Sequence, residues 1–370
     1  MLLPMSLRLL VAVLLGALTL PLRAQPWHKM DNPEAVRSGL EANAARVYRF
    51  KPASNVRPLP PAPDNESTRP VISAVQSFAR GTYGTLLLEN GLVLFEGYGQ
   101  GAQADSMIGA YSVTKSWTAL AVGEALCAGR IKSLDDLAQA YAPQLQGTAY
   151  GRASVRDLLR YTSGAEDPGG NGYIGIHNLR DFNAMVEHRM SLAELIGKHG
   201  APSRFKPGEK FIYNGLDSEA LSLVVREATG QPLQAWFEAT VWQEAGGESS
   251  AAWFVDSEGN GIAEVLVFAT TRDFARIGLY VLERLTDQAG SACMRQFVKE
   301  AASPLVAKGY WQSAPAYGMG LHTGADGQVW MFGYNGQRIG VRTDRRRVFV
   351  TTNNRDGEAI DRGSQSLLSR

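Results

Sequence analysis

The stretch Tyr111-Ser112-Val113-Thr114-Lys115, followed by Ser116-Trp117-Thr118-Ala119-Leu120, has the form Ser-x-x-Lys at the start of an apolar helical pattern. In a helix that begins here, Ser112 and Lys115 lie on one face, one turn apart. An amine would then be within reach of a hydroxyl, at a helix N-terminus whose free N–H groups stabilise negative charge. This arrangement is typical of a serine nucleophile activated by a lysine, although the motif alone also occurs by chance.

The composition of the chain is that of an ordinary globular enzyme. Of its 370 residues, 45% are hydrophobic and 20% are charged, and the net charge is +1. So small a net charge argues against nucleic acid or an anionic membrane surface as the main partner. The densest basic cluster, Arg345-Arg346-Arg347, lies between two β-like stretches and is expected to be an exposed turn.

The cysteines and histidines show none of the spacings that metal sites have, so we expect no metal and no cofactor. Cys127 falls on the apolar face of the helix that follows Ser112. Two interpretations of this residue stay open, a buried free thiol and a disulfide with Cys293.

Residues 1–24 have the features of a secretory signal. Arg8 supplies a positive charge, and the apolar run from Leu9 to Leu20 is too short to span a bilayer comfortably. Cleavage after this segment would place the protein in the periplasm or outside the cell, with no stable membrane insertion. An uncleaved anchor is the alternative.

Residues 25–70 are expected to form an arm ahead of the main domain. A short helix is predicted from Asn32 to Val47, with Asn32 as N-cap and Pro33 at the first helical position. The proline-rich segment from Lys51 to Pro70 indicates an extended linker.

Residues 71–370 carry β patterns at both ends and helical patterns in the middle. Asn90-Gly91 separates two apolar runs, which is a strong signal for a β-hairpin. The C-terminal part returns to strands around the turn Gly333–Gly336, whereas a helix is predicted from Leu266 to about Arg284. The sequence therefore predicts an α+β fold. Its antiparallel sheet comes from both chain ends and is flanked by helices, with a helical subdomain inserted at about residues 130–300.

Several stretches, in order, resemble the serine β-lactamase-related hydrolases, which include class C β-lactamases, D,D-peptidases and esterases. The resemblance is greatest to the 6-aminohexanoate-dimer-hydrolase type. The matching stretches are Asn90-Gly91, Tyr111–Lys115, Ile131–Asp136, Arg156–Leu159 with Thr162–Gly164, Pro207-Gly208 with Phe211–Tyr213, Ala228–Gly230, Ala269–Asp273 and Phe332–Gln337. The resemblance implies a β-lactamase/transpeptidase-like fold.

The resemblance also implies catalytic roles. Ser112 would be acylated by the substrate carbonyl, and Lys115 would take its proton if burial or nearby positive charge lowers the lysine pKa. Tyr213 matches the tyrosine of the family motif Tyr-x-Asn and would relay protons, with a core tyrosine as the alternative. The chain departs from this motif because Gly215 stands in the place of the asparagine. Asn214, one position early, becomes a candidate substrate contact.

The family's third motif, Lys-Thr-Gly, aligns best with Met331-Phe332-Gly333. The backbone N–H of Tyr334 would then complete an oxyanion hole with that of Ser112. His322-Thr323-Gly324 is a competing match, set aside because a hairpin turn is predicted directly after it. The remaining candidate substrate contacts are Tyr111, Gly333, Gly336, and Asp167 and Asn171 of a glycine-rich loop, for which solvated loop positions are the alternative.

Taken together, these features predict a secreted serine hydrolase that acts on small esters or linear amides through an acyl-Ser112 intermediate. A D,D-peptidase or β-lactamase is the alternative enzyme, against which the missing asparagine and the missing lysine of the third motif count. A non-catalytic relative that binds peptides is the alternative outside the enzymes.

Overall fold

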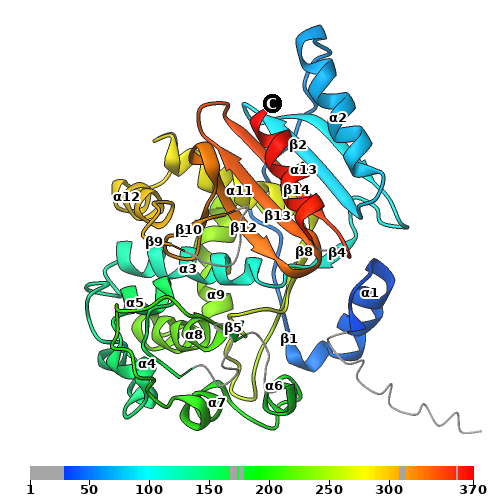
Figure 1. The fold of residues 1–370 in the computed structure, drawn as a ribbon. Helices are drawn as coiled ribbons and strands as arrows, with labels where there is room; N and C mark the ends of the chain where they lie inside the picture. Colours follow the sequence, from blue (N-terminus) through cyan, green and yellow to red (C-terminus); the bar gives the residue numbers. More distant parts are fainter. Residues whose placement is uncertain (1–28, 167–172, 175–178, 308–313, 356) are drawn as a thin grey trace, which may run out of the picture.

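The computed structural model describes residues 29–166, 173–174, 179–307, 314–355 and 357–370 (Figure 1). The expected signal segment, residues 1–24, therefore lies outside the described residues. Within the described part of the chain, no helix has the length and apolar character that crossing a bilayer requires.

An eight-stranded antiparallel sheet is the largest among the described residues, in the order β3-β2-β14-β13-β12-β11-β10-β9. Its strands are β2 (Gly84–Glu89), β3 (Leu92–Tyr98), β9 (Val306–Ala307), β10 (Ala316–Tyr317), β11 (His322–Thr323), β12 (Val329–Gly333), β13 (Gln337–Arg342) and β14 (Arg347–Thr352). Strand β2 pairs with β14, from Glu89 opposite Arg347 to Gly84 opposite Thr352. The prediction of an α+β fold with one antiparallel sheet built from both chain ends is confirmed.

The Asn90-Gly91 hairpin forms as predicted. Both residues have positive φ angles, 53° and 80°, as a tight two-residue turn between twisted strands requires. The turn joins β2 to β3, which is the strand at one edge of the large sheet.

A second, four-stranded sheet leads the chain into the Ser-x-x-Lys stretch. Its order is β1-β7-β8-β4, formed by β1 (Val47–Arg49), β7 (Ala252–Phe254), β8 (Val267–Thr270) and β4 (Met107–Gly109). The helix predicted from Leu266 is therefore wrong in its first turn. Residues 267–270 are all buried and pair with strands on both sides, and only then does Thr270 cap a helix by accepting from the N–H of Asp273.

Thirteen α-helices are found among the described residues. They are α1 (Pro33–Ala42), α2 (Arg69–Ala79), α3 (Val113–Cys127), α4 (Ala149–Arg152), α5 (Val155–Arg160), α6 (Leu179–Val186), α7 (Leu192–His199), α8 (Gly215–Thr229), α9 (Leu233–Phe237), α10 (Gln243–Ala245), α11 (Thr271–Leu285), α12 (Ala292–Ala301) and α13 (Glu358–Ser369). The helix predicted in the arm is shorter than expected. Asn32 caps it as predicted, by accepting from the N–H of Ala35, but it ends at Ala42 and the arm continues into β1.

Helices cover both faces of the large sheet (Figure 1). Helices α2 and α13 lie on one face, where Val75 and Leu368 pack in one apolar cluster with Trp330 and Phe349 of the strands. Helix α11 lies on the other face, so close to β13 and β14 that a Cβ at Gly278 would come 2.5 Å from Val348. Helices α4 to α8 gather on the far side of α3.

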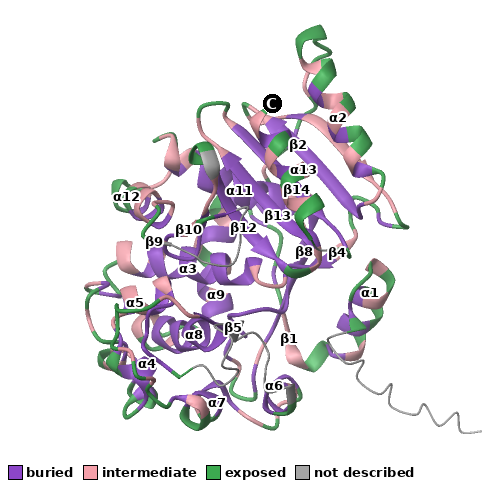
Figure 2. Cartoon of the chain, viewed as in Figure 1, coloured by how far each residue is buried: buried purple, intermediate pink, exposed green. Residues whose placement is uncertain are grey.

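Helix α3 runs through the interior of the protein. Nearly all of its residues from Val113 to Ala125 are buried, which Figure 2 shows as an almost continuous purple segment. Trp117 stacks on Phe237 of α9 with ring centroids 4.8 Å apart. A helix buried on all sides keeps its position because every face is packed, so the residues at its N-terminus are held firmly.

A disulfide joins the end of α3 to α12. Cys127 and Cys293 are bonded, with their Cα atoms 5.6 Å apart and a sequence separation of 166. Of the two interpretations that the sequence left open for Cys127, the structure has the disulfide.

We predict that the paired substitution Cys127→Ser/Cys293→Ser lowers the free energy of unfolding by about 2–4 kcal/mol, because the bond restricts the unfolded chain over a long loop. Urea unfolding of the oxidised wild type and the variant measures the difference. Wild-type protein held in reductant is the control and should unfold like the variant. Equal midpoints for oxidised wild type and variant would contradict this.

Candidate active site

The chain enters α3 through a sharp turn that places the half-buried Ser112 at the start of the helix. After β4 ends at Gly109, the N–H of Ala110 donates to the carbonyl oxygen of Val267 at 2.7 Å. Tyr111 then has a φ of 48°, a left-handed conformation that is uncommon outside glycine. The strand and the buried helix on either side fix this turn, so Ser112 is held in one position.

Lys115 lies one turn further along α3, as the motif spacing predicts. Its Nζ donates to Ser112 Oγ at 3.2 Å and to the carbonyl oxygen of Glu264 at 2.7 Å. The lysine side chain is only 3% exposed. Burial lowers the pKa of Lys115, and the carboxylates of Glu264 and Glu219 partly oppose this effect. The lower pKa increases the fraction of Lys115 that is neutral, and so able to accept a proton, at a given pH.

Two buried carboxylates adjoin the lysine. Glu264 Oε2 lies 3.8 Å from Lys115 Nζ. The carboxylate of Glu219, in α8, accepts the backbone N–H groups of Ala263 and Glu264 at 2.8 and 3.1 Å. Burial and the repulsion of Glu264 raise the pKa of Glu219 well above its usual value. The sequence analysis missed both residues, because no local spacing connects them to Ser112.

The departure at Gly215 has a structural cause. A Cβ at this position would lie 1.8 Å from Glu264 Oε2, far inside van der Waals contact. The carboxylate of Glu264 therefore occupies the space into which a side chain at position 215 would project. The Glu264 carboxylate, a hydrogen-bond acceptor, thus lies where the Cβ of the motif's asparagine would be.

Asn214 is directed into the protein. Its Oδ1 accepts the N–H of Leu216 at 3.0 Å, which caps α8, and its Nδ2 donates to the hydroxyl of Tyr150 at 2.7 Å. The residue is 1% exposed. Both ends of the amide are used within the protein, so the structure does not bring this expected substrate contact to the site.

Tyr213 lies beside Lys115, with its ring centroid 5.4 Å from Nζ. It belongs to a buried aromatic cluster in which its centroid is 4.9 Å from that of Tyr161 and 6.5 Å from that of His322. Tyr161, a left-handed residue with a φ of 56°, has its hydroxyl 2.7 Å from Ser218 Oγ. The structure thus brings together Ser112, Lys115 and Tyr213 from two separate parts of the chain.

His322 was set aside in the sequence analysis, yet it lies in this cluster. The predicted hairpin turn does form, since β11 pairs with β12 and places His322 opposite Trp330. The ring of His322 is nevertheless 4.8 Å from that of Tyr317 and 4.9 Å from that of Phe332, measured between centroids. The turn that follows Gly324 leads into β12, which runs back alongside β11. His322 therefore stays next to the residues of β12, near Phe332.

The end of β12 approaches the chain just before Ser112. A Cβ at Gly333 would lie 2.3 Å from the carbonyl oxygen of Ala110, so only glycine allows this contact. The ring of Tyr334 is 5.8 Å from that of Tyr111, and Asn335 Nδ2 donates to the Tyr111 hydroxyl at 3.2 Å. The segment that aligns with the third motif, Met331–Gly333, thus ends beside the turn before Ser112.

The remaining candidates have other positions. Gly336 has a φ of 80°, and a Cβ there would meet the carbonyl oxygen of Arg355 at 2.3 Å, so it serves the turn after β12. Asp167 and Asn171 lie outside the described residues. The chain that follows them returns as β5 (Tyr173–Ile174), which pairs in parallel with β6 (Tyr213–Asn214).

We predict that Gly215→Ala is destabilising by about 1–3 kcal/mol, because the new methyl group would overlap the Glu264 carboxylate. Adding Glu264→Ala should recover about 1 kcal/mol or more relative to the sum of the two single changes. Urea unfolding of the three variants gives this coupling energy.

The matched control is Gly197→Ala in α7, where a Cβ meets no atom within 4 Å. It should be neutral or stabilising, because alanine favours helix formation. Strictly additive effects at positions 215 and 264 would contradict the overlap.

Comparisons with known proteins agree with this geometry. A family model described as Beta-lactamase matches residues 77–368. Among curated proteins, the chain is 28% identical over 209 residues to the 6-aminohexanoate-dimer hydrolase of Paenarthrobacter ureafaciens. That alignment covers 54% of this chain and 51% of the relative, so the chain spans about half the length of the curated relative that it matches.

Solved structures share the fold over most of the chain. A Bacillus anthracis protein named as a 6-aminohexanoate-dimer hydrolase has a TM-score of 0.71 at 17% identity, covering 92% of this chain and 94% of its own. EstCE1, described as a hydrolase with promiscuous acyltransferase activity, has a TM-score of 0.67 at 15% identity and coverages of 83% and 100%. A penicillin-binding protein from Bacillus halodurans has a TM-score of 0.64 at 17% identity and coverages of 81% and 99%.

The structural neighbours, all of low identity, show the β-lactamase/transpeptidase-like fold. The family model goes further, because it matches most of the chain and its span includes Ser112, Lys115 and Tyr213. By this match the chain belongs to the Beta-lactamase family.

Proposed function

We propose that this protein is a secreted serine hydrolase that cleaves small esters or linear amides through an acyl-Ser112 intermediate. The observation that carries the proposal is the contact of 3.2 Å between Lys115 Nζ and Ser112 Oγ in a site where the lysine is buried. A serine hydroxyl becomes a good nucleophile only when a neighbouring base can take its proton.

The proposed reaction has two halves. In the first, neutral Lys115 takes the proton of Ser112 as Oγ bonds to the carbonyl carbon, and the backbone N–H groups of Ser112 and Tyr334 bind the oxyanion. The intermediate collapses, and the leaving group departs with the proton, which Tyr213 relays from Lys115. In the second half, water attacks the acyl-Ser112 ester, and the same groups return its proton to Ser112.

The neighbourhood of the third motif favours neutral substrates. Met331 and Phe332, where the family has its lysine, are buried apolar residues at the end of β12. The acceptor group at Gly215 belongs to Glu264, and an ionised carboxylate cannot donate a hydrogen bond as an asparagine amide does. Both differences remove groups that would recognise a β-lactam. The names of two relatives, a 6-aminohexanoate-dimer hydrolase and the hydrolase EstCE1, are consistent with amide or ester substrates.

Secretion is supported by two independent features. Residues 1–24 have the composition of a signal segment. The bond between Cys127 and Cys293 is of a kind that persists mainly in oxidising compartments such as the periplasm or the extracellular space.

We predict that a fluorophosphonate probe labels the wild type and that Ser112→Ala abolishes labelling. Hydrolysis of p-nitrophenyl acetate should fall by about three orders of magnitude or more, because the nucleophile is lost. The matched control is Ser116→Ala, one turn along α3, whose hydroxyl donates to the carbonyl oxygen of Gly320. It should retain labelling. Folded wild type that no probe labels would instead favour a non-catalytic, peptide-binding relative.

A substrate panel separates the candidate enzymes. We expect hydrolysis of p-nitrophenyl acetate and of linear amides but not of the β-lactam nitrocefin, because the carboxylate-binding lysine is missing. Turnover of nitrocefin or of a D-alanyl-D-alanine peptide, with Ser112→Ala as the blank, would favour the β-lactamase or D,D-peptidase alternative.

We predict that kcat/KM rises with pH and levels off once Lys115 is neutral, at a pKa below the usual value for lysine. The Glu264 carboxylate favours the protonated lysine and so raises this pKa. Glu264→Gln removes that charge and should shift the rising limb of the pH–rate profile to lower pH. The exposed carboxylate of Glu258 offers the control Glu258→Gln, which should leave the profile in place. A shift to higher pH in Glu264→Gln would contradict the assignment of Lys115 as the base.

A further inference from the structure

The segment Gly261–Glu264 runs through the interior of the protein next to helices α3 and α8, outside every helix and strand. All four of its residues are buried. Buried backbone of irregular shape has no hydrogen-bond ladder of its own, so its N–H and carbonyl groups need partners from other parts of the chain. In this segment, side chains supply most of those partners.

All four carbonyl oxygens of the segment accept a hydrogen bond from a side chain. The donors, in order from Gly261 to Glu264, are Ser222 Oγ at 2.8 Å, Trp253 Nε1 at 2.8 Å, Thr118 Oγ1 at 3.1 Å and Lys115 Nζ at 2.7 Å. Groups from α8, β7 and α3 therefore fix the direction of four consecutive carbonyl groups. The last of these carbonyl groups is the one that receives the candidate base.

Glu219 holds the N–H side of the same segment. Its two carboxylate oxygens separately accept the N–H groups of Ala263 and Glu264, at 2.8 and 3.1 Å. The peptide unit between Ala263 and Glu264 is thus held on both sides, because its carbonyl oxygen accepts from Thr118 and its N–H donates to Glu219. This peptide unit directly precedes the carbonyl group that binds Lys115.

The chain leaves the segment through a strained residue. Leu266 has a φ of 70°, which is rare for a bulky side chain. Such a conformation persists only where the surrounding structure imposes it. The carbonyl oxygen of Leu266 accepts the N–H of Phe254 at 3.1 Å, and that of Val267 accepts the N–H of Ala110, just before Ser112. Packing therefore links the segment to the strand that fixes the entry to the nucleophile.

The Glu264 carbonyl oxygen is able to orient the amine of Lys115. A neutral amine has two N–H donors and one lone pair. When one N–H is donated to the carbonyl oxygen at 2.7 Å, rotation of the amine is restricted and the lone pair can be directed at Ser112 Oγ, 3.2 Å away. Efficient proton transfer requires this alignment as well as a suitable pKa.

We propose that Glu219 and Thr118 are positioning residues for the proton transfer from Ser112 to Lys115, acting through the segment Gly261–Glu264. The proposal rests on the proposed function, because it concerns the same base. In this role the two residues hold one peptide unit from opposite sides, and the Glu264 carbonyl group passes that constraint on to the amine.

A positioning role and a charge effect of Glu219 predict different results. Charge alone favours protonated Lys115, so on that basis Glu219→Gln would move the rising limb of the pH–rate profile to lower pH and keep its plateau. Loss of position lowers the plateau itself, because the neutral amine is then misaligned. We expect kcat on the plateau to fall by about tenfold or more, with little change in KM.

Thr118 offers a test without a change of charge. Thr118→Val keeps the shape of the side chain but removes its hydroxyl, and should lower the plateau kcat for p-nitrophenyl acetate by about fivefold, as expected for one lost hydrogen bond. Thr118→Ser keeps the hydroxyl and should restore most of the rate. The matched control is Thr240→Val, which removes a hydroxyl bonded to the carbonyl oxygen of Trp236, one turn back in its own helix. It should behave like the wild type.

Hydrogen exchange gives a readout that does not depend on activity. Peptides spanning residues 261–265 should exchange faster in Glu219→Gln and Thr118→Val than in the wild type, with melting temperatures showing that each variant is folded. If Glu219→Gln does not fold, the Thr118 variants decide alone.

The possible failures are distinguishable. In an active wild type, the positioning role is overturned if the segment stays protected in the variants, or if it loosens while the plateau kcat is unchanged. A wild type that no fluorophosphonate probe labels would refute the proposed function itself, and the positioning role with it.

Discussion

The cost of burying an ammonium group beside Ser112 is the constraint on which the candidate site depends. Helix α3 is packed on every side, so Lys115 has almost no contact with solvent. Burial alone would favour the neutral amine, whereas Glu264 and Glu219 favour the cation. The balance between these two effects decides whether Lys115 can act as a base near neutral pH. Everything that packs α3, including the stack on Phe237 and the disulfide at its end, also maintains that balance.

The second motif shows how a residue from a distant segment can occupy the space of a missing side chain. The sequence departs from the family pattern at Gly215, and the missing side chain makes room for the carboxylate of Glu264. Glu219 holds the backbone of that segment through two hydrogen bonds. The change replaces an amide that can donate and accept with a group that only accepts when ionised. The change leaves the contact between Lys115 Nζ and Ser112 Oγ in place.

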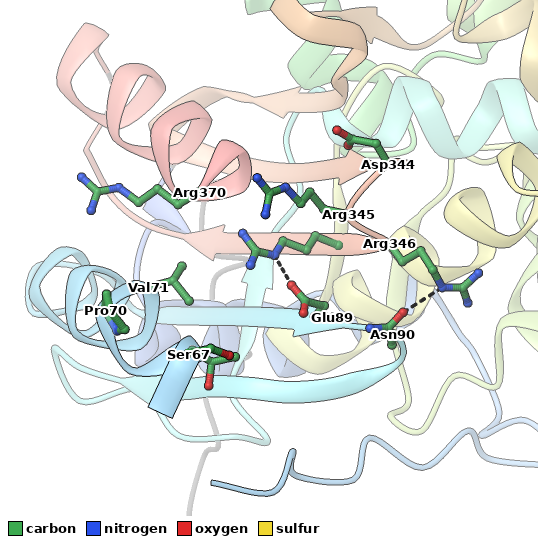
Figure 3. A pocket seen from close by; sticks show the side chains of 11 residues that line it. Ser67, Pro70, Val71, Glu89, Asn90, Asp344, Arg345, Arg346 and Arg370 are labelled. Carbon is green, nitrogen blue, oxygen red and sulfur yellow. Dashed lines mark hydrogen bonds and ion pairs between the residues drawn. The ribbon is translucent and has the colours of Figure 1, made fainter. Parts of the chain in front are cut away.

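The β13–β14 hairpin carries different chemistry at its two ends. At one end, Gly333 of β12 lies opposite Gln337 of β13 and allows the chain to approach the turn before Ser112 closely. At the other end, arginines and carboxylates together line a hollow (Figure 3).

The sequence by itself determined the class of the fold and the spacing that brings Lys115 to Ser112. The Asn90-Gly91 turn, the apolar runs at both ends and the Ser-x-x-Lys spacing each depend on local geometry, so they predicted the hairpins, the antiparallel sheet and the approach of Lys115 to Ser112. Local patterns failed where long-range contacts decide. Residues 267–270 form a strand and not a helix because they pair with strands on both sides. Asn214 points inward because its Nδ2 donates a hydrogen bond to the hydroxyl of Tyr150. Only the tertiary structure placed Glu264, Glu219 and His322 beside the motif residues and joined Cys127 to Cys293. These groups are far apart along the chain, and packing alone brings them together.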